Sequence, residues 1–175
     1  MSFSMSRGVK AASGALLLSA IVSIAAAQAP PAGGAPPGGG EGMGAGPSPA
    51  ERAIEYRKAV YTVLGGNWGP IGQMVAGRMP FNGPVAAKSA TRAAQIAAMA
   101  VDAYPDVSKD GNTKAKPEIW TNRAEFDKIN KDLSDHTAAL AALLAKDTTG
   151  GDAFKAAATA VANDCKACHD KFRAK

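Results

Sequence analysis

A five-residue run near the C-terminus, Cys165-Lys166-Ala167-Cys168-His169, constrains this chain more than any other feature, and it contains the only two cysteines among 175 residues. Positions i, i+3 and i+4 share one face of an α-helix, so a helical conformation places both thiols and the imidazole on a single surface. A C-x-x-C-H run is typical of covalent haem attachment. We therefore predict one haem c, held through two thioethers at Cys165 and Cys168, with His169 as the metal ligand.

A redox pair, a zinc site or a disulfide would each account for fewer of these residues. A thioredoxin-type redox pair is found beside βαβ patterns, and the sequence has no such pattern. A structural zinc site needs four ligands, and His136 is the only other histidine. A simple disulfide would account for the two cysteines but not for His169.

The N-terminal segment has the features of a secretory signal peptide. Arg7 and Lys10 form a basic start, residues 11–24 are mostly apolar, and residues 25–27 are three alanines that suit cleavage. We expect cleavage after Ala27 and export to the periplasm. The alternative is an uncleaved anchor, but a stretch rich in Ala and Ser makes a poor membrane span, so we expect no stable membrane anchor.

Composition divides the rest of the chain into two parts. Residues 28–47 are almost entirely Ala, Pro and Gly, with Glu41 the only charged residue, so they cannot bury apolar surface and are predicted to form a disordered leader. Residues 48–175 remain for one domain. Loss of residues 1–27 removes two basic groups and no acidic group, which lowers the formal charge from +5 to +3. This field is too weak to indicate a nucleic-acid partner.

Helical patterns fill the predicted domain. Ser48 and Glu51 form a capping box around Pro49, which starts a helix to about residue 76, with irregularities expected at Gly65-Gly66 and Pro70. A second helix is expected from Pro84 toward residue 104, followed by a long loop over residues 106–117. A third helix is expected after a cap near residue 121, and a fourth, capped by residue 152, carries the cysteine motif.

No segment predicts a strand of any length, so the fold class is all-α, an antiparallel four-helix bundle with a cofactor site on its last helix. Met74 and Met99 are expected in the core. His136 is expected at the boundary of the third helix beside Asp132 and Asp135, with iron ligation as the alternative.

From Ser48 to its C-terminus, the chain also resembles the cytochrome c′ family of class II c-type cytochromes. The resemblance is carried by four segments: Tyr56-Arg57-Lys58-Ala59, Gly77 to Phe81, Pro117-Glu118-Ile119-Trp120, and Cys165 to Arg173. It implies a haem within the bundle, with His169 as the proximal ligand and the first helix as the distal wall.

The same resemblance implies roles for four further cofactor-binding residues. Arg57 matches an arginine near the haem edge that can meet a propionate through charge-assisted hydrogen bonds. Arg173 matches an arginine one turn beyond the proximal histidine, and Trp120 a tryptophan near the haem. Tyr61 matches a position at which the low-spin relatives carry a methionine that ligates the iron. A neutral phenol is a poor iron ligand, so we expect an open sixth position behind Tyr61.

An open position predicts a five-coordinate iron that binds small diatomic gases, nitric oxide or carbon monoxide. The family's link to nitric oxide suggests sequestration of that gas. The alternative is a six-coordinate, low-spin electron carrier with an unidentified redox partner. We expect no enzymatic activity and no catalytic residue, because no distal acid–base pair is evident. A homodimer is usual in the family, and exposed small residues are expected to permit it or a monomer: Ala86, Ala90 and Ala94.

Overall fold

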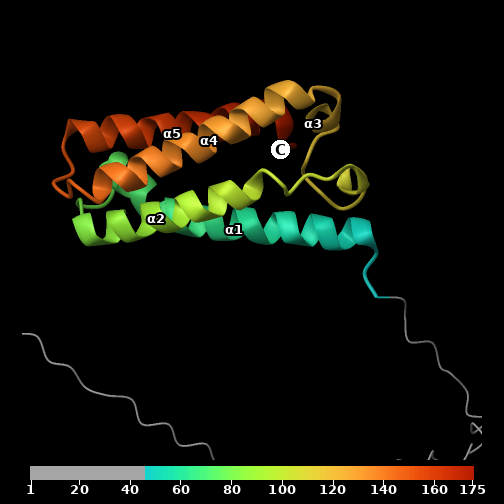
Figure 1. Cartoon of the computed structure of the whole chain (residues 1–175), viewed down its shortest axis with the longest axis horizontal. Helices are drawn as coiled ribbons and strands as arrows, with labels where there is room; N and C mark the ends of the chain where they lie inside the picture. Colours follow the sequence, from blue (N-terminus) through green and yellow to red (C-terminus); the bar gives the residue numbers. More distant parts are fainter. Residues whose placement is uncertain (1–45) are drawn as a thin grey trace, which may run out of the picture. The chain divides into compact units, whose positions relative to one another are not determined.

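The computed structural model describes residues 46–175 (Figure 1), and the predicted signal peptide, residues 1–27, lies outside the described residues, as do residues 28–45 of the predicted leader. Four long helices run alternately up and down the bundle: α1 (Pro49–Val75), α2 (Gly83–Ala100), α4 (Arg123–Leu144) and α5 (Asp152–Phe172). Figure 1 shows α1 beside α2 in one layer and α4 beside α5 in the other. The predicted antiparallel four-helix bundle is confirmed.

The helix ends follow local sequence signals. The Ser48 hydroxyl accepts a hydrogen bond from the Glu51 amide at 3.2 Å, and the Glu51 carboxylate accepts one from the Ser48 amide at 2.7 Å, which confirms the capping box. Asn82 caps α2 by accepting from the Val85 amide at 3.0 Å. Gly77 follows the end of α1 at φ 67°, a conformation that costs glycine little.

Several predicted boundaries were wrong. The helix α1 is continuous through Gly65-Gly66 and Pro70, since the solvent next to the exposed Gly66 can satisfy the carbonyl that proline leaves free. The helix α2 ends at Ala100, four residues before Tyr104. The N-cap of α5 is Gly151 rather than Asp152, and no side chain caps it.

The region before the third long helix is also more divided than expected. The long loop contains a 3₁₀ turn, η1 (Asp106–Ser108), and a separate short helix, α3 (Glu118–Thr121), precedes α4. Asn122 adopts φ −119° and ψ 50° between the two, which breaks the helical path there. The expected cap near Thr121 is therefore the last residue of α3.

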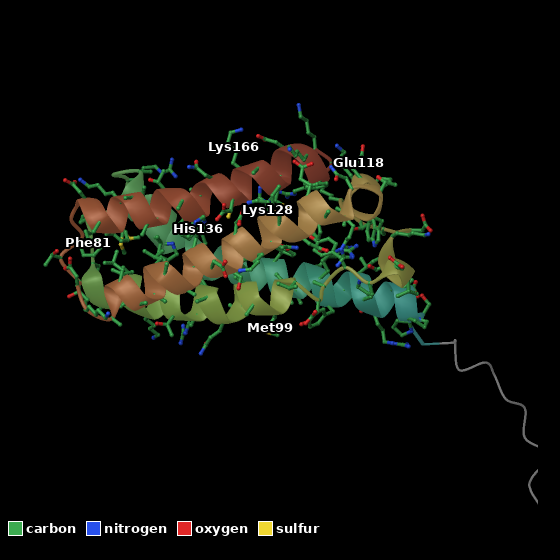
Figure 2. All side chains as sticks on the ribbon, turned by 45° about the horizontal axis from the view of Figure 1, so that its top comes forward. Phe81, Met99, Glu118, Lys128, His136 and Lys166 are labelled. Carbon is green, nitrogen blue, oxygen red and sulfur yellow. The ribbon has the colours of Figure 1, made fainter. Side chains whose placement is uncertain are left out.

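The bundle core is made of alanine on α2 facing larger apolar residues of the other three helices. Ala86 and Ala90 are completely buried in it, so the expectation that they are exposed was wrong, and Ala94 is only partly exposed. Small side chains there let α2 approach its neighbours closely. Met74 is buried as predicted, whereas Met99 is 48% exposed and points outward (Figure 2).

A second apolar cluster closes the end of the bundle where α1 begins and α5 ends: Ala103, Tyr104, Ile119, Phe126 and Phe172. Beside it the chain after α5 pairs with the long loop. The Lys116 amide donates to the Phe172 carbonyl at 2.9 Å, and the Ala174 amide donates to Lys114 at 2.8 Å. This single bridge is the only β pairing in residues 46–175. It holds the C-terminal residues against the loop.

None of the helices described in residues 46–175 combines the length and the apolar character needed to cross a membrane.

Candidate functional site

A cavity of about 820 Å³ opens between α1, α4, α5 and the loop after α2, at the end closed by the second apolar cluster. This volume lies within the roughly 300–1,000 Å³ common for cofactor and ligand sites. Much of its wall is apolar or aromatic, and in the described part of the chain no acidic residue lines it. The cavity is therefore suited to a large, mostly apolar group that also carries negative charge.

The last turns of α5 bring the cysteine motif to this cavity. Cys165, Cys168 and His169 all line it, as their spacing on one helical face predicts. Both cysteines are free and partly exposed, so the disulfide alternative is not what the structure contains. The three residues thus present two thiols and an imidazole to one space.

The protonation of these groups suits covalent attachment and metal ligation. Burial raises the pKa of the Cys165 thiol, and it raises the pKa of Cys168 to about 11, so both remain neutral thiols at pH 7. Partial burial, helped by the positive charge of Arg173, lowers the pKa of His169. A neutral imidazole is the form that binds a metal.

Arg57 connects α1 to the long loop from inside the wall. It is 4% exposed and donates at 2.8 Å to the hydroxyls of Ser108 and Thr113. Its guanidinium carbon lies 4.8 Å from the centre of the Tyr104 ring. Burial lowers the pKa of Arg57. Within residues 46–175 no carboxylate pairs with this buried cation, so an acidic group on a ligand would complete the site.

Tyr61 reaches into the cavity from α1, one helical turn after Arg57. Its hydroxyl donates to Asn130 Oδ1 at 3.2 Å, and its ring meets the edge of Tyr104 with 6.0 Å between ring centres. Burial, above all, raises the pKa of the Tyr61 phenol. Tyr61 therefore presents a protonated phenol at neutral pH.

The remaining predicted residues occupy different places. Arg173 is exposed at the cavity mouth, together with Lys58 and Lys114. Trp120 does not line the cavity; its ring centre is 5.9 Å from the Arg57 guanidinium carbon, and its buried Nε1 has no partner among residues 46–175. The structure thus brings Arg173 to the cavity with Arg57 and Tyr61, but leaves Trp120 in a supporting position.

His136 is not among the residues that line the cavity. Its Nδ1 lies 2.7 Å from a carboxylate oxygen of Asp164 on α5, and its side chain is 45% exposed. Figure 2 shows His136 between α4 and α5. The boundary position predicted for it agrees with the structure, and the alternative as an iron ligand is wrong for this arrangement.

Sequence reasoning missed four residues that shape the cavity: Trp68, Tyr104, Thr113 and Asn130. Only Asn130 had a recognisable signal. It stands four residues after Phe126 and three before Leu133, so an amide interrupts the apolar stripe of α4. Such a residue is buried, and Asn130 is 3% exposed.

Comparison with known proteins gives one consistent result. Residues 52–173 match the family model described as Cytochrome C′. Cytochrome c′ from Rubrivivax gelatinosus is 35% identical over 126 residues, which cover 70% of this chain and 95% of the relative.

Solved structures agree with this match. Cytochrome c prime from Shewanella frigidimarina superimposes with a TM-score of 0.66 at 30% identity, covering 71% of this chain and 95% of the other. Cytochrome c prime from Alcaligenes xylosoxidans is similar at 28% identity, with a TM-score of 0.63 for a ferrous variant with bound NO. Each of the two alignments spans most of the length of the domain predicted from the sequence, residues 48–175.

Proposed function

Because the chain belongs to the cytochrome c′ family, we propose that it is a c-type haem protein whose iron binds small diatomic gases, nitric oxide and carbon monoxide. One observation carries the proposal. Both thiols and the imidazole of the C-x-x-C-H motif line the same cavity, and Tyr61 of α1 lines it too. The NO-bound relative from Alcaligenes xylosoxidans supports the choice of ligand.

The residues of the cavity fit one haem. Cys165 and Cys168 would form the two thioethers, and His169 would ligate the iron from the side of α5. Arg57 is a buried cation without a carboxylate partner among the described residues, and it would donate hydrogen bonds to a haem propionate. Arg173 would pair with another acidic group of the haem at the cavity mouth. When bound, the haem supplies an iron that can take a gas molecule and can change its oxidation state.

The rest of the cavity wall would offer a bound iron no good second protein ligand. Tyr61 stays protonated because its burial raises the phenol pKa, and a neutral phenol ligates iron poorly. In residues 46–175, neither a methionine nor a second histidine lines the cavity. Tyr61 therefore limits the size of what can enter without closing the position.

Further parts of the proposal concern the setting of the protein. We place it in the periplasm after export, with a role in nitric oxide sequestration or electron transfer and without enzymatic turnover. Association into homodimers through the first two helices is supported by exposed apolar side chains on α1 and α2: Tyr56, Val63, Val85 and Met99. A redox partner remains part of the alternative function, a low-spin electron carrier.

An absorption spectrum of the purified, dithionite-reduced holoprotein, before and after addition of CO, tests the proposal. We expect a broad high-spin Soret band that sharpens and shifts when CO binds. A sharp low-spin spectrum that CO leaves unchanged would overturn gas binding. It would show a sixth protein ligand and favour the electron carrier.

A further inference from the structure

One polar group interrupts the apolar part of the cavity wall. Asn130 on α4 lies between Ile129 and Leu133, which both line the cavity, and it is 3% exposed. Its Oδ1 accepts the hydrogen bond from the Tyr61 hydroxyl at 3.2 Å. Its Nδ2 is buried, and no partner for it exists in residues 46–175. Buried amide donors in folded proteins are almost always paired, so this one indicates a missing acceptor.

The direction of the Tyr61–Asn130 bond assigns the protons. A carboxamide oxygen only accepts, so the phenol must be the donor, and its single proton is used on Asn130. The protons left over in this part of the wall belong to Nδ2. Tyr61 and Asn130 thus form a pair in which the phenol is held in place and the amide is free to donate.

The cationic side chains of the cavity suit carboxylates better than Asn130 Nδ2 does. Three exposed cations stand at the cavity mouth, namely Lys58, Lys114 and Arg173, and the buried Arg57 adds a fourth positive group. Propionates are best matched there, because a carboxylate prefers cations and solvent. Asn130 stands instead among apolar side chains next to Tyr61. The acceptor that fits Nδ2 is a small, weakly polar molecule.

We propose that Asn130 donates a hydrogen bond from Nδ2 to the oxygen atom of a diatomic gas bound in the cavity beside Tyr61. The proposal rests on the function proposed above and adds the residue that selects among gases. Tyr61 is the positioning partner: its hydroxyl holds the carboxamide oxygen, which leaves Nδ2 as the unpaired donor of the pair among residues 46–175. A donor at this place favours ligands that draw electron density from the iron onto their oxygen.

The C–O stretching frequency of the ferrous CO complex reports such a donor directly, because a hydrogen bond to the bound oxygen lowers it. We expect the holoprotein variant Asn130→Leu to show a higher frequency than wild type and a several-fold faster CO dissociation. Asn130→Gln, which keeps an amide, should restore part of both changes. Asn163→Leu, at an exposed position on α5, is the matched control for the same substitution.

The variant Tyr61→Phe decides which group is the donor. If Tyr61→Phe raises the frequency while Asn130→Leu does not, the phenol donates to the gas and the proposal is wrong. Equal frequencies in wild type and Asn130→Leu, with CO bound in both, also overturn it and leave the proposed function intact. Failure of wild type to bind CO would remove both. Should Asn130→Leu not fold, as judged by far-UV circular dichroism, Asn130→Ala gives the same comparison.

Discussion

Tyr61 is the residue on which the properties of the cavity depend most. It lines the same cavity as the cysteine motif, and its ring and hydroxyl contact Tyr104 and Asn130. Contacts on two sides restrict the motion of the Tyr61 side chain. Its phenol therefore determines the chemical properties of this part of the cavity wall. Substitution here should change the coordination of a bound iron more than substitution anywhere else on α1.

We predict that Tyr61→Met converts the iron to a low-spin state, because a thioether is a far better ligand than a neutral phenol. The absorption spectrum of the reduced variant should show a sharp Soret band and a weaker response to CO. Val63→Met is the matched control, since Val63 is 52% exposed on the same helix and should leave the spectrum unchanged. A high-spin spectrum for Tyr61→Met would mean that residue 61 does not face the iron.

The burial of Tyr61 also predicts its behaviour with pH. Burial disfavours the phenolate, so the folded-state pKa lies above the ordinary value of about 10. Titration of the ferric protein up to about pH 10 should therefore produce no phenolate-to-iron charge-transfer band. The same titration of Tyr61→Phe should overlay that of wild type. A band that appears only in wild type below this pH would contradict the prediction.

At the scale of elements, the long loop between α2 and α3 depends on Arg57. This loop has little regular structure beyond η1, yet Arg57 reaches it from α1 and binds the hydroxyls of Ser108 and Thr113. The C-terminal residues pair with the same loop through Ala115 and Arg173. The hydrogen bonds of Arg57 and the bridge to the C-terminal residues thus both hold this loop, which forms one wall of the cavity.

We expect Arg57→Met to lower the free energy of unfolding by about 2–3 kcal/mol, since hydrogen bonds to charged groups contribute more than neutral ones. Urea denaturation of the holoprotein measures this change. Arg92→Met, at an exposed position on α2, should change stability by less than about 0.5 kcal/mol. Equal midpoints for the two variants would show that the loop is held without Arg57.

At the scale of the whole molecule, the bundle is asymmetric along its length. One end has a dense core in which buried alanines of α2 meet larger side chains, and the other contains the cavity between α1, α4 and α5. A wall around 820 Å³ of space lacks the contacts that stabilise a packed interior. A covalently held group that fills this space should therefore stabilise the entire fold.

The double variant Cys165→Ser/Cys168→Ser should prevent covalent attachment while retaining most of the helix content. We expect its Tm to fall by more than about 5 °C, because about 1 kcal/mol shifts Tm by roughly 3–5 °C in a domain of this size. Circular dichroism at 222 nm measures both properties. Lys166→Ser, at an exposed position between the two cysteines, is the control. An unchanged Tm with no haem bound would show that the bundle is stable alone.

Local signals in the sequence determined the helices and the cofactor motif. These signals depend only on neighbouring residues, so the sequence shows them without knowledge of the fold. They are the capping box at Ser48, the helix-breaking pair Gly150-Gly151, and the spacing of Cys165, Cys168 and His169. The same holds for the apolar periodicity that predicted four helices and their bundle. The end of α2 was predicted too late, because a turn directly after Ala100 ends the helix and the apolar pattern does not reveal that turn.

Only the tertiary structure decided which side chains share the cavity and what each of them contacts. Arg57 finds Ser108 and Thr113 more than fifty residues away, and Tyr61 finds Asn130 on a different helix. The burial of Ala86 and the exposure of Met99 likewise depend on how α2 is rotated against its neighbours. Such pairings arise from the packing of whole helices, and a pattern within one helix carries no information about the residue it will face across the bundle.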